Sequence, residues 1–106
     1  MPASSKRLEF LRKLTASGNV DPFAWYGLAM EYRSLERWDE ALATFTTLRE
    51  RSPDYVAMYL MCGQMLEKLG RGAEAKAWMT AGLEAARAKG DAHAASELEA
   101  ALGTLA

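Results

Sequence analysis

The sequence is poor in the residues that usually build metal sites and covalent cross-links. Among 106 residues it has one cysteine, Cys62, and one histidine, His93. A lone cysteine cannot form an internal disulfide, and a chain of this kind suits a reducing compartment. A lone histidine without neighbouring cysteines gives none of the ligand spacings of a zinc site. We therefore predict no metal, no cofactor and a cytoplasmic location.

The chain also lacks a long apolar run and an excess of charge of either sign. Its longest apolar stretch lies around residues 55–62, far short of the ~20 residues that a membrane-spanning helix needs. Eight basic and seven acidic residues precede Asp54, whereas five basic and seven acidic residues occur from Asp54 onward. Neither half has the basic surplus of a nucleic-acid binder. These counts argue against membrane and nucleic-acid partners.

The beginning of the chain has the pattern of an amphipathic helix. Leu8, Leu11 and Leu14 fall on one stripe among basic residues, and the two serines before them are candidate N-caps. The charges interrupt the apolar stretch, which does not fit a signal peptide. We expect this helix to act as half of a repeat that packs on the next helix. Binding to a membrane surface is the alternative interpretation.

Two helical patterns separated by a polar break fill residues 22–55. The pair Asp21-Pro22 favours a helix start, because aspartate caps the free N–H groups and proline suits the first helical position. We predict helices over residues 22–35 and 38–51, with Pro53 closing the unit. Apolar residues recur at helical spacing in both, namely Trp25, Leu28, Ala29 and Tyr32 in the first and Ala41, Phe45 and Leu48 in the second.

A second copy of this unit occupies residues 56–89, displaced by thirty-four positions. Seven aligned pairs are identical: Leu35/Leu69, Arg37/Arg71, Glu40/Glu74, Ala41/Ala75, Ala43/Ala77, Thr46/Thr80 and Glu50/Glu84. No proline matches Pro53 in the second copy, so its last helix is expected to continue to residue 88 or 89. Gly90 then favours a left-handed helix end, and Asp91 is expected to cap a final helix over residues 93–105.

The arrangement of Trp25, Leu28, Ala29, Tyr32, Ala41, Phe45 and Pro53 resembles the signature of the tetratricopeptide repeat, with alanine replacing the usual glycine. This resemblance implies an all-α fold, a short right-handed α-solenoid of antiparallel helix pairs. It implies one domain, residues 1–106, in four parts. These are an N-terminal helix (1–21), repeat 1 (22–55), repeat 2 (56–89) and a capping helix (90–106).

The resemblance also implies a peptide-binding groove on the first helix of each repeat. Some family members use lysine and asparagine there to bind the carboxylate of chaperone tails. Tyr26, Met30 and Met61 stand in those places here, which argues against such a clamp and for an apolar, adaptable surface. The groove residues carried over by alignment are Phe23, Tyr26, Met30, Arg33, Leu60, Met61, Gln64 and Lys68.

No constellation in the sequence indicates catalysis. Cys62 falls at a position where the repeat needs a buried apolar side chain, and His93 falls on an exposed face. Glu31 and Glu67 are the nearest candidates for acid–base carboxylates, and both are interpreted as solvated or salt-bridged. We predict no catalytic residue and no enzyme activity.

The sequence therefore predicts a non-catalytic scaffold that binds an apolar or amphipathic peptide segment in its groove. A homodimer joined through the same apolar faces is the alternative. The groove could also be covered by the chain's own terminal helices. An enzyme or a cofactor carrier would require a cluster of titratable groups in a pocket, which the pattern does not contain.

Overall fold

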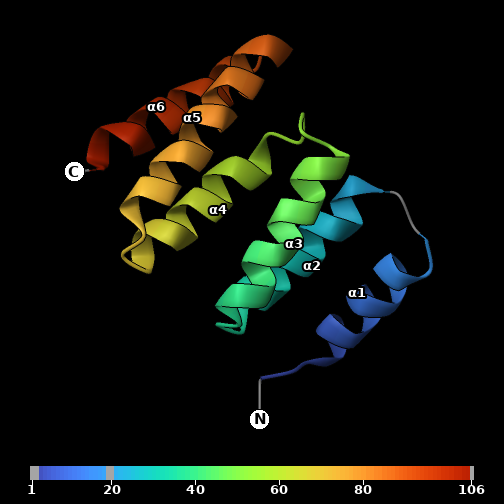
Figure 1. The fold of residues 1–106 in the computed structure, drawn as a ribbon. Coiled ribbons are helices and arrows are strands. Elements are labelled where there is room, and N and C mark those ends of the chain that lie inside the picture. The colour runs from blue at the N-terminus through green and yellow to red at the C-terminus, as the bar shows by residue number, and fades with distance from the viewer. Residues whose placement is uncertain (1–2, 19–20, 106) are drawn as a thin grey trace. The chain divides into compact units, whose positions relative to one another are not determined.

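A computed structural model describes residues 3–18 and 21–105 of the chain. These residues form six α-helices and no strand (Figure 1). The outer limits of the predicted domain, residues 1 and 106, lie outside the described part. The helices are α1 (Lys6–Ala16), α2 (Pro22–Ser34), α3 (Trp38–Arg51), α4 (Ala57–Lys68), α5 (Gly72–Lys89) and α6 (Ala92–Thr104).

The chain divides into two compact units, Met1–Ser52 and Pro53–Ala106. The first unit contains α1 packed on α2, and α2 paired with α3. The second contains α4 paired with α5, and α6 packed mainly on α5 with a smaller contact to α4. The division falls within three residues of the predicted boundary between the repeats. The predicted all-α class is confirmed.

Caps define the starts of three helices. The Ser5 hydroxyl accepts the Leu8 N–H at 3.0 Å and begins α1. Asp21 accepts the Phe23 N–H at 2.9 Å, with Pro22 at the first helical position of α2. Asp91 accepts the Ala94 N–H at 3.0 Å and begins α6. Each cap uses a side-chain oxygen to satisfy a backbone donor that lacks a partner within its helix.

The connections within the two helix pairs repeat the same backbone geometry. A residue with positive φ ends each first helix, Glu36 at 58° and Gly70 at 76°. The next N–H groups, of Arg37 and Arg71, donate to Tyr32 and Leu66 five residues back. The two copies therefore share one tight turn, which glycine adopts without steric cost and glutamate adopts with strain.

The apolar stripes predicted from helical spacing form the cores of the units. Leu28, Ala29 and Tyr32 on α2 are buried, as are Ala41, Phe45 and Leu48 on α3. Trp25, the first residue of the predicted stripe, is instead partly exposed. In the second unit the buried residues include Tyr59, Cys62 and Leu66 on α4, Met79 on α5 and Leu98 on α6. Cys62 is fully buried, as predicted from the repeat pattern.

The predicted helix bounds differ from the observed ones by at most about one residue. Gly90 has φ 73° and ends α5 in the left-handed conformation, as expected. The helix α6 starts at Ala92 and ends at Thr104, each one residue before its predicted limit. In the described part of the chain, no helix is long and apolar enough to span a bilayer.

Candidate functional site

The eight predicted groove residues divide equally between the two units. Four lie on α2 in the first unit, and four lie on α4 in the second. Gln64 and Lys68 are exposed, while Leu60 and Met61 are partly exposed. On α2, Phe23 is exposed and the other three are partly exposed, namely Tyr26, Met30 and Arg33. All eight side chains are therefore at least partly accessible.

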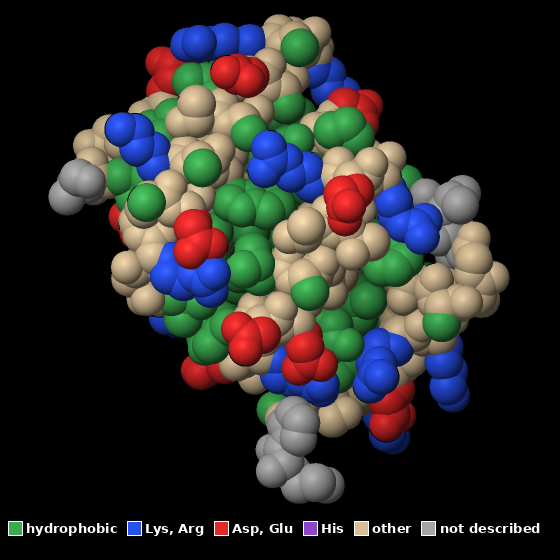
Figure 2. All heavy atoms as spheres, viewed as in Figure 1, with side chains coloured by type: hydrophobic (Ala, Val, Ile, Leu, Met, Phe, Trp, Pro, Cys, Tyr) green, Lys and Arg blue, Asp and Glu red, His purple; other side chains and the backbone are tan. Residues whose placement is uncertain are grey.

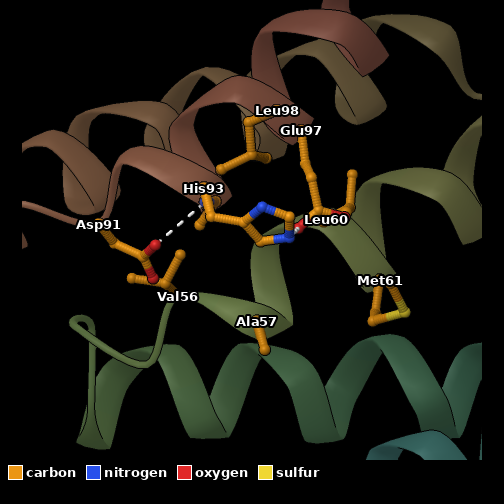
Figure 3. A pocket seen from close by; sticks show the side chains of 9 residues that line it. Val56, Ala57, Leu60, Met61, Asp91, His93, Glu97 and Leu98 are labelled. Carbon is orange, nitrogen blue, oxygen red and sulfur yellow. Dashed lines mark hydrogen bonds and ion pairs between the residues drawn. The ribbon is translucent and has the colours of Figure 1, made fainter.

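A pocket of about 260 Å³ lies between α4 and α6 of the second unit. Its α4 wall includes two predicted groove residues, Leu60 and Met61. Leu98, which is buried, contributes to the α6 wall. Figure 3 shows Met61 and Leu60 extending from α4, with Leu98 on the helix opposite. The second unit thus carries a largely apolar hollow on the face where the sequence places the groove.

Polar side chains of α6 stand at the edge of this pocket. His93 Nε2 lies 3.2 Å from Glu97 Oε1, which is an ion pair when the imidazole is protonated. In Figure 3 these two side chains extend from α6 toward Leu60 on α4. The His93 side chain is 88% exposed, which confirms the predicted solvent exposure and adds a position beside the pocket.

A second, more open hollow continues along α4 and α6. Its lining includes Leu60 again, together with Gln64 and Glu67 from α4 and Glu97 from α6. The predicted groove residues Leu60, Met61 and Gln64 therefore border two hollows that share Leu60 and Glu97 in their linings. Lys68, at the last turn of α4, borders neither hollow.

The first unit has a separate hollow of about 270 Å³ between α1 and α2. Among the four predicted α2 residues, Phe23 alone contributes to its lining. Tyr26 lies one turn along α2, where partial burial raises the pKa of its hydroxyl and the nearby Arg33 charge opposes that rise. Met30 is partly exposed farther along the same helix.

The two glutamates considered as acid–base candidates have ordinary surroundings. The Glu31 carboxylate accepts the Ser5 hydroxyl at 2.8 Å and lies 3.4 Å from Arg7 Nε. It therefore joins α2 to the start of α1, as a salt-bridged residue does. Glu67 is exposed. In residues 3–18 and 21–105, no three His, Cys, Asp or Glu side chains cluster as a metal site would require.

Charges of both signs are interspersed with hydrophobic side chains on the face seen in Figure 2. That face carries no extended patch of one sign, in agreement with the near balance of basic and acidic residues. Hydrophobic atoms reach the surface between the charges. Such a surface can bind a partner by apolar contact and use scattered charges for orientation.

Helical spacing failed to identify three features of these hollows. Phe10 and Leu14 of α1 line the hollow of the first unit, and His93 lines the pocket of the second. The repeat pattern indicates which face of a helix is apolar, but not which neighbour leaves part of that face uncovered. The lone signal for Phe10 was its place beside the apolar stripe of the first helix.

Comparison with known proteins identifies the repeat. The sequence profile of the tetratricopeptide repeat matches residues 32–102. A tetratricopeptide repeat domain protein from Salinibacter ruber, solved in solution, is 39% identical over 77% of this chain and 83% of its own, with a TM-score of 0.74. A crystal structure of such a domain from the same organism is also 39% identical, covering 77% and 91%, with a TM-score of 0.71.

A protein from Bordetella parapertussis is similar over a longer stretch. It is 26% identical over 96% of this chain and 89% of its own, with a TM-score of 0.81. No curated protein matches the sequence. The profile covers more than half of the chain, and the Salinibacter ruber domains exceed 30% identity over more than two thirds of it. The chain belongs to the tetratricopeptide repeat family.

Proposed function

We propose that this chain is a non-catalytic scaffold that binds an apolar or amphipathic segment of another protein. Tetratricopeptide repeats are in general protein–protein interaction modules. The observation that supports the proposal most is the apolar pocket between α4 and α6, where Leu60 and Met61 are partly exposed in a well-packed unit. The cytoplasmic location inferred from the single cysteine belongs to the same proposal.

The size and lining of the pocket favour a side chain over a small-molecule ligand. Its volume of about 260 Å³ is below the ~300–1,000 Å³ of most small-molecule sites. Leucine and methionine walls suit an apolar anchor, and methionine adapts its shape to irregular partners. Gln64 in the adjoining hollow offers an amide that can pair with the backbone of a bound segment.

The remaining predicted residues belong to the same proposal. Tyr26, Met30 and Arg33 on α2 are partly exposed, and Phe23 is exposed. We assign them to partner contact, together with Lys68 on α4. Tyr26 offers a large rigid ring with a polar end, which is the kind of side chain that anchors protein interfaces.

Site-specific photo-crosslinking in the source organism tests the proposal. A photoreactive phenylalanine analogue replaces Gln64, which is exposed beside the pocket, and, as a control, Thr80, which is exposed on α5. We expect a discrete protein adduct at position 64 and none at position 80. The double substitution Leu60→Ser with Met61→Ala should reduce the adduct by about tenfold or more, while Leu83→Ala on α5 should leave it intact.

The identity of the crosslinked protein separates the alternatives. An adduct between two copies of this chain would replace the scaffold proposal with a homodimer through the same apolar residues. Equal crosslinking at positions 64 and 80, or no adduct at position 64, would contradict both. Far-ultraviolet circular dichroism of each variant should match that of the parent chain, because the altered side chains are partly exposed.

A further inference from the structure

The charged side chains that line the two hollows of the second unit are mostly of one sign. The pocket between α4 and α6 includes Asp91, His93 and Glu97, and the adjoining hollow includes Glu67 and again Glu97. Among the described residues, no lysine or arginine lines either hollow. His93 adds a positive charge only when its imidazole is protonated. The two linings therefore carry three carboxylates and no permanent positive charge.

The hollow of the first unit does not have this imbalance. Among the residues that the structure describes, its charged lining is one arginine, Arg7, and one aspartate, Asp21. In the second unit, Lys68 follows Glu67 in sequence, but it lies in the last turn of α4 and borders neither hollow. The excess of negative charge thus belongs to the surface between α4 and α6.

The two hollows follow α4 and α6 along their lengths. The pocket is lined by residues between 57 and 61 of α4 and between 93 and 98 of α6. The adjoining hollow is lined by residues between 60 and 67 of α4 and between 97 and 104 of α6. The helices therefore run beside each other in the same direction, and Glu97 lines both hollows. Figure 3 shows Glu97 extending from α6 toward Leu60 on α4.

Two of the three carboxylates are accessible to a partner. The Glu97 side chain is 50% exposed, and its Oε1 lies 3.2 Å from His93 Nε2. Glu67 is exposed and takes part in none of the ion pairs of the described chain. Asp91, by contrast, uses its carboxylate to cap α6. A cation from outside the chain would therefore meet Glu67 and Glu97 first.

From these observations we propose that the segment bound between α4 and α6 is basic. It places an apolar side chain in the pocket and a neighbouring lysine or arginine against Glu67 and Glu97. This inference rests on the proposed function and adds the charge of the partner to it. A cation compensates carboxylates that binding partly removes from water, whereas an acidic segment would bring like charges together. Arginine can also bind a carboxylate through two parallel hydrogen bonds.

Charge and shape together favour a protein segment over an anionic membrane. The three carboxylates would repel acidic lipid headgroups, and the apolar side chains line a hollow, whereas a membrane-binding helix presents a projecting apolar face. The lined stretch of α4, from residue 57 to residue 67, extends about 15 Å. A bound segment of about three helical turns, or about five extended residues, has this length.

Selection from a displayed peptide library tests the sign of the partner's charge. Every peptide has about 10 residues, which form about three helical turns, and it carries one leucine at a fixed central position among random residues. Selection against the full chain should enrich Lys and Arg beside the leucine over Asp and Glu. The strongest binder is then made as a labelled peptide, and its dissociation constant is measured by fluorescence anisotropy.

Glutamine variants locate the contact with the basic residues of the peptide. Glu67→Gln and Glu97→Gln should each raise the dissociation constant about fivefold. Glu84→Gln is the matched control, because it removes the same charge from an exposed position of α5 that lines neither hollow. It should leave the dissociation constant unchanged. Glu67→Lys with Glu97→Lys should instead favour a copy of the peptide that has Glu in place of its Lys and Arg.

Leu60→Ser with Met61→Ala separates this inference from the proposed function. If that variant loses the peptide, a selection without basic enrichment, or an affinity insensitive to Glu67→Gln and Glu97→Gln, would overturn the basic partner and leave the apolar docking in place. A selection without any binder, or a peptide that binds that variant as tightly as the parent chain, would overturn both. A dimer in light scattering that Glu67→Lys with Glu97→Lys converts to a monomer would overturn the inference in favour of a second copy of the chain.

Discussion

Two glycines of the second unit control how closely its helices approach. A Cβ atom added to Gly82 on α5 would lie 2.4 Å from Tyr59 Cβ and 3.2 Å from Leu98 Cδ2. One added to Gly63 on α4 would lie 2.7 Å from Met79 Cγ. The aligned position of the first repeat holds Leu48 in place of Gly82. In the second repeat, α5 therefore has a glycine where the first repeat has a leucine, and Tyr59 and Leu98 occupy the space beside it.

The substitution Gly82→Ala should destabilise the chain although alanine is the better helix former. Alanine gains about 1 kcal/mol of helix propensity, but the new methyl group meets the base of Tyr59, which cannot rotate away. Overpacking of this kind costs about 1–3 kcal/mol. We expect a net loss of up to about 2 kcal/mol in the free energy of unfolding, measured by urea denaturation.

Gly103→Ala on α6 is the matched control for this prediction. A Cβ atom there meets no heavy atom within 4 Å, and its backbone φ is not positive. The control should be neutral or stabilising by up to about 1 kcal/mol. A Gly82→Ala variant as stable as the control would show that α5 can move away from Tyr59 at no cost.

At the scale of the helix, the start of each second helix carries the same arginine–glutamate pair. Arg37 Nε donates to Glu40 Oε1 at 2.7 Å, and Arg71 Nε donates to Glu74 Oε1 at 2.9 Å, with a second parallel bond in each pair. Neither α3 nor α5 has a side-chain N-cap bond. The glutamates lie in the first turn, where the helix dipole favours negative charge. The repeated pair thus holds each N-cap arginine against the first turn of its helix.

These pairs predict a pH dependence with a definite sign. Hydrogen bonds from Arg37 and Arg71 hold the pKa values of Glu40 and Glu74 below the ordinary value of 4.5. A carboxylate with a lowered folded-state pKa stabilises the fold above the unfolded pKa and loses that contribution as the pH falls through the folded value. The free energy of unfolding should therefore decrease from about pH 5 toward pH 3.

The variant Glu40→Gln measures how much the Arg37–Glu40 pair contributes to the pH dependence of the free energy of unfolding. We expect a shallower decrease in the free energy of unfolding over the same pH range, because glutamine does not titrate. Glu84→Gln provides the control, since Glu84 is exposed and outside any ion pair of the described chain. Equal slopes for the two variants would contradict a contribution from the Arg37–Glu40 pair.

Elements with strong local signals could be predicted from the sequence, whereas the exposed surfaces could not. Asp21-Pro22 and Gly90 have a local chemistry that fixes a helix end, and the structure places helix ends there. The exposure of Phe10 and Phe23 depends on how α1 packs on α2, where a Cβ atom added to Gly27 would lie 3.3 Å from Leu11 Cδ2. Helical spacing cannot predict this exposure, because it shows which face of a helix is apolar but not which other helix covers that face.

At the scale of the whole molecule, the open question is how many cooperative units the chain contains. Each compact unit, Met1–Ser52 and Pro53–Ala106, is smaller than the ~60 residues at which independent folding is already marginal. In repeat proteins, each repeat gains stability from its neighbours. We therefore propose that the chain unfolds as one domain, as the repeat pattern of the sequence predicts.

Tryptophan fluorescence can test this proposal because the tryptophans are unevenly distributed. With Trp78→Phe, the remaining tryptophans, Trp25 and Trp38, lie in the first unit. Adding Gly82→Ala then destabilises the second unit alone. If the chain is one domain, the urea midpoint reported by tryptophan should fall together with that from circular dichroism. If the units unfold independently, the urea midpoint reported by tryptophan will stay where it was, and circular dichroism will show a separate, earlier transition of the second unit. The reason is that a destabilised second unit can affect the first unit only when the two unfold cooperatively.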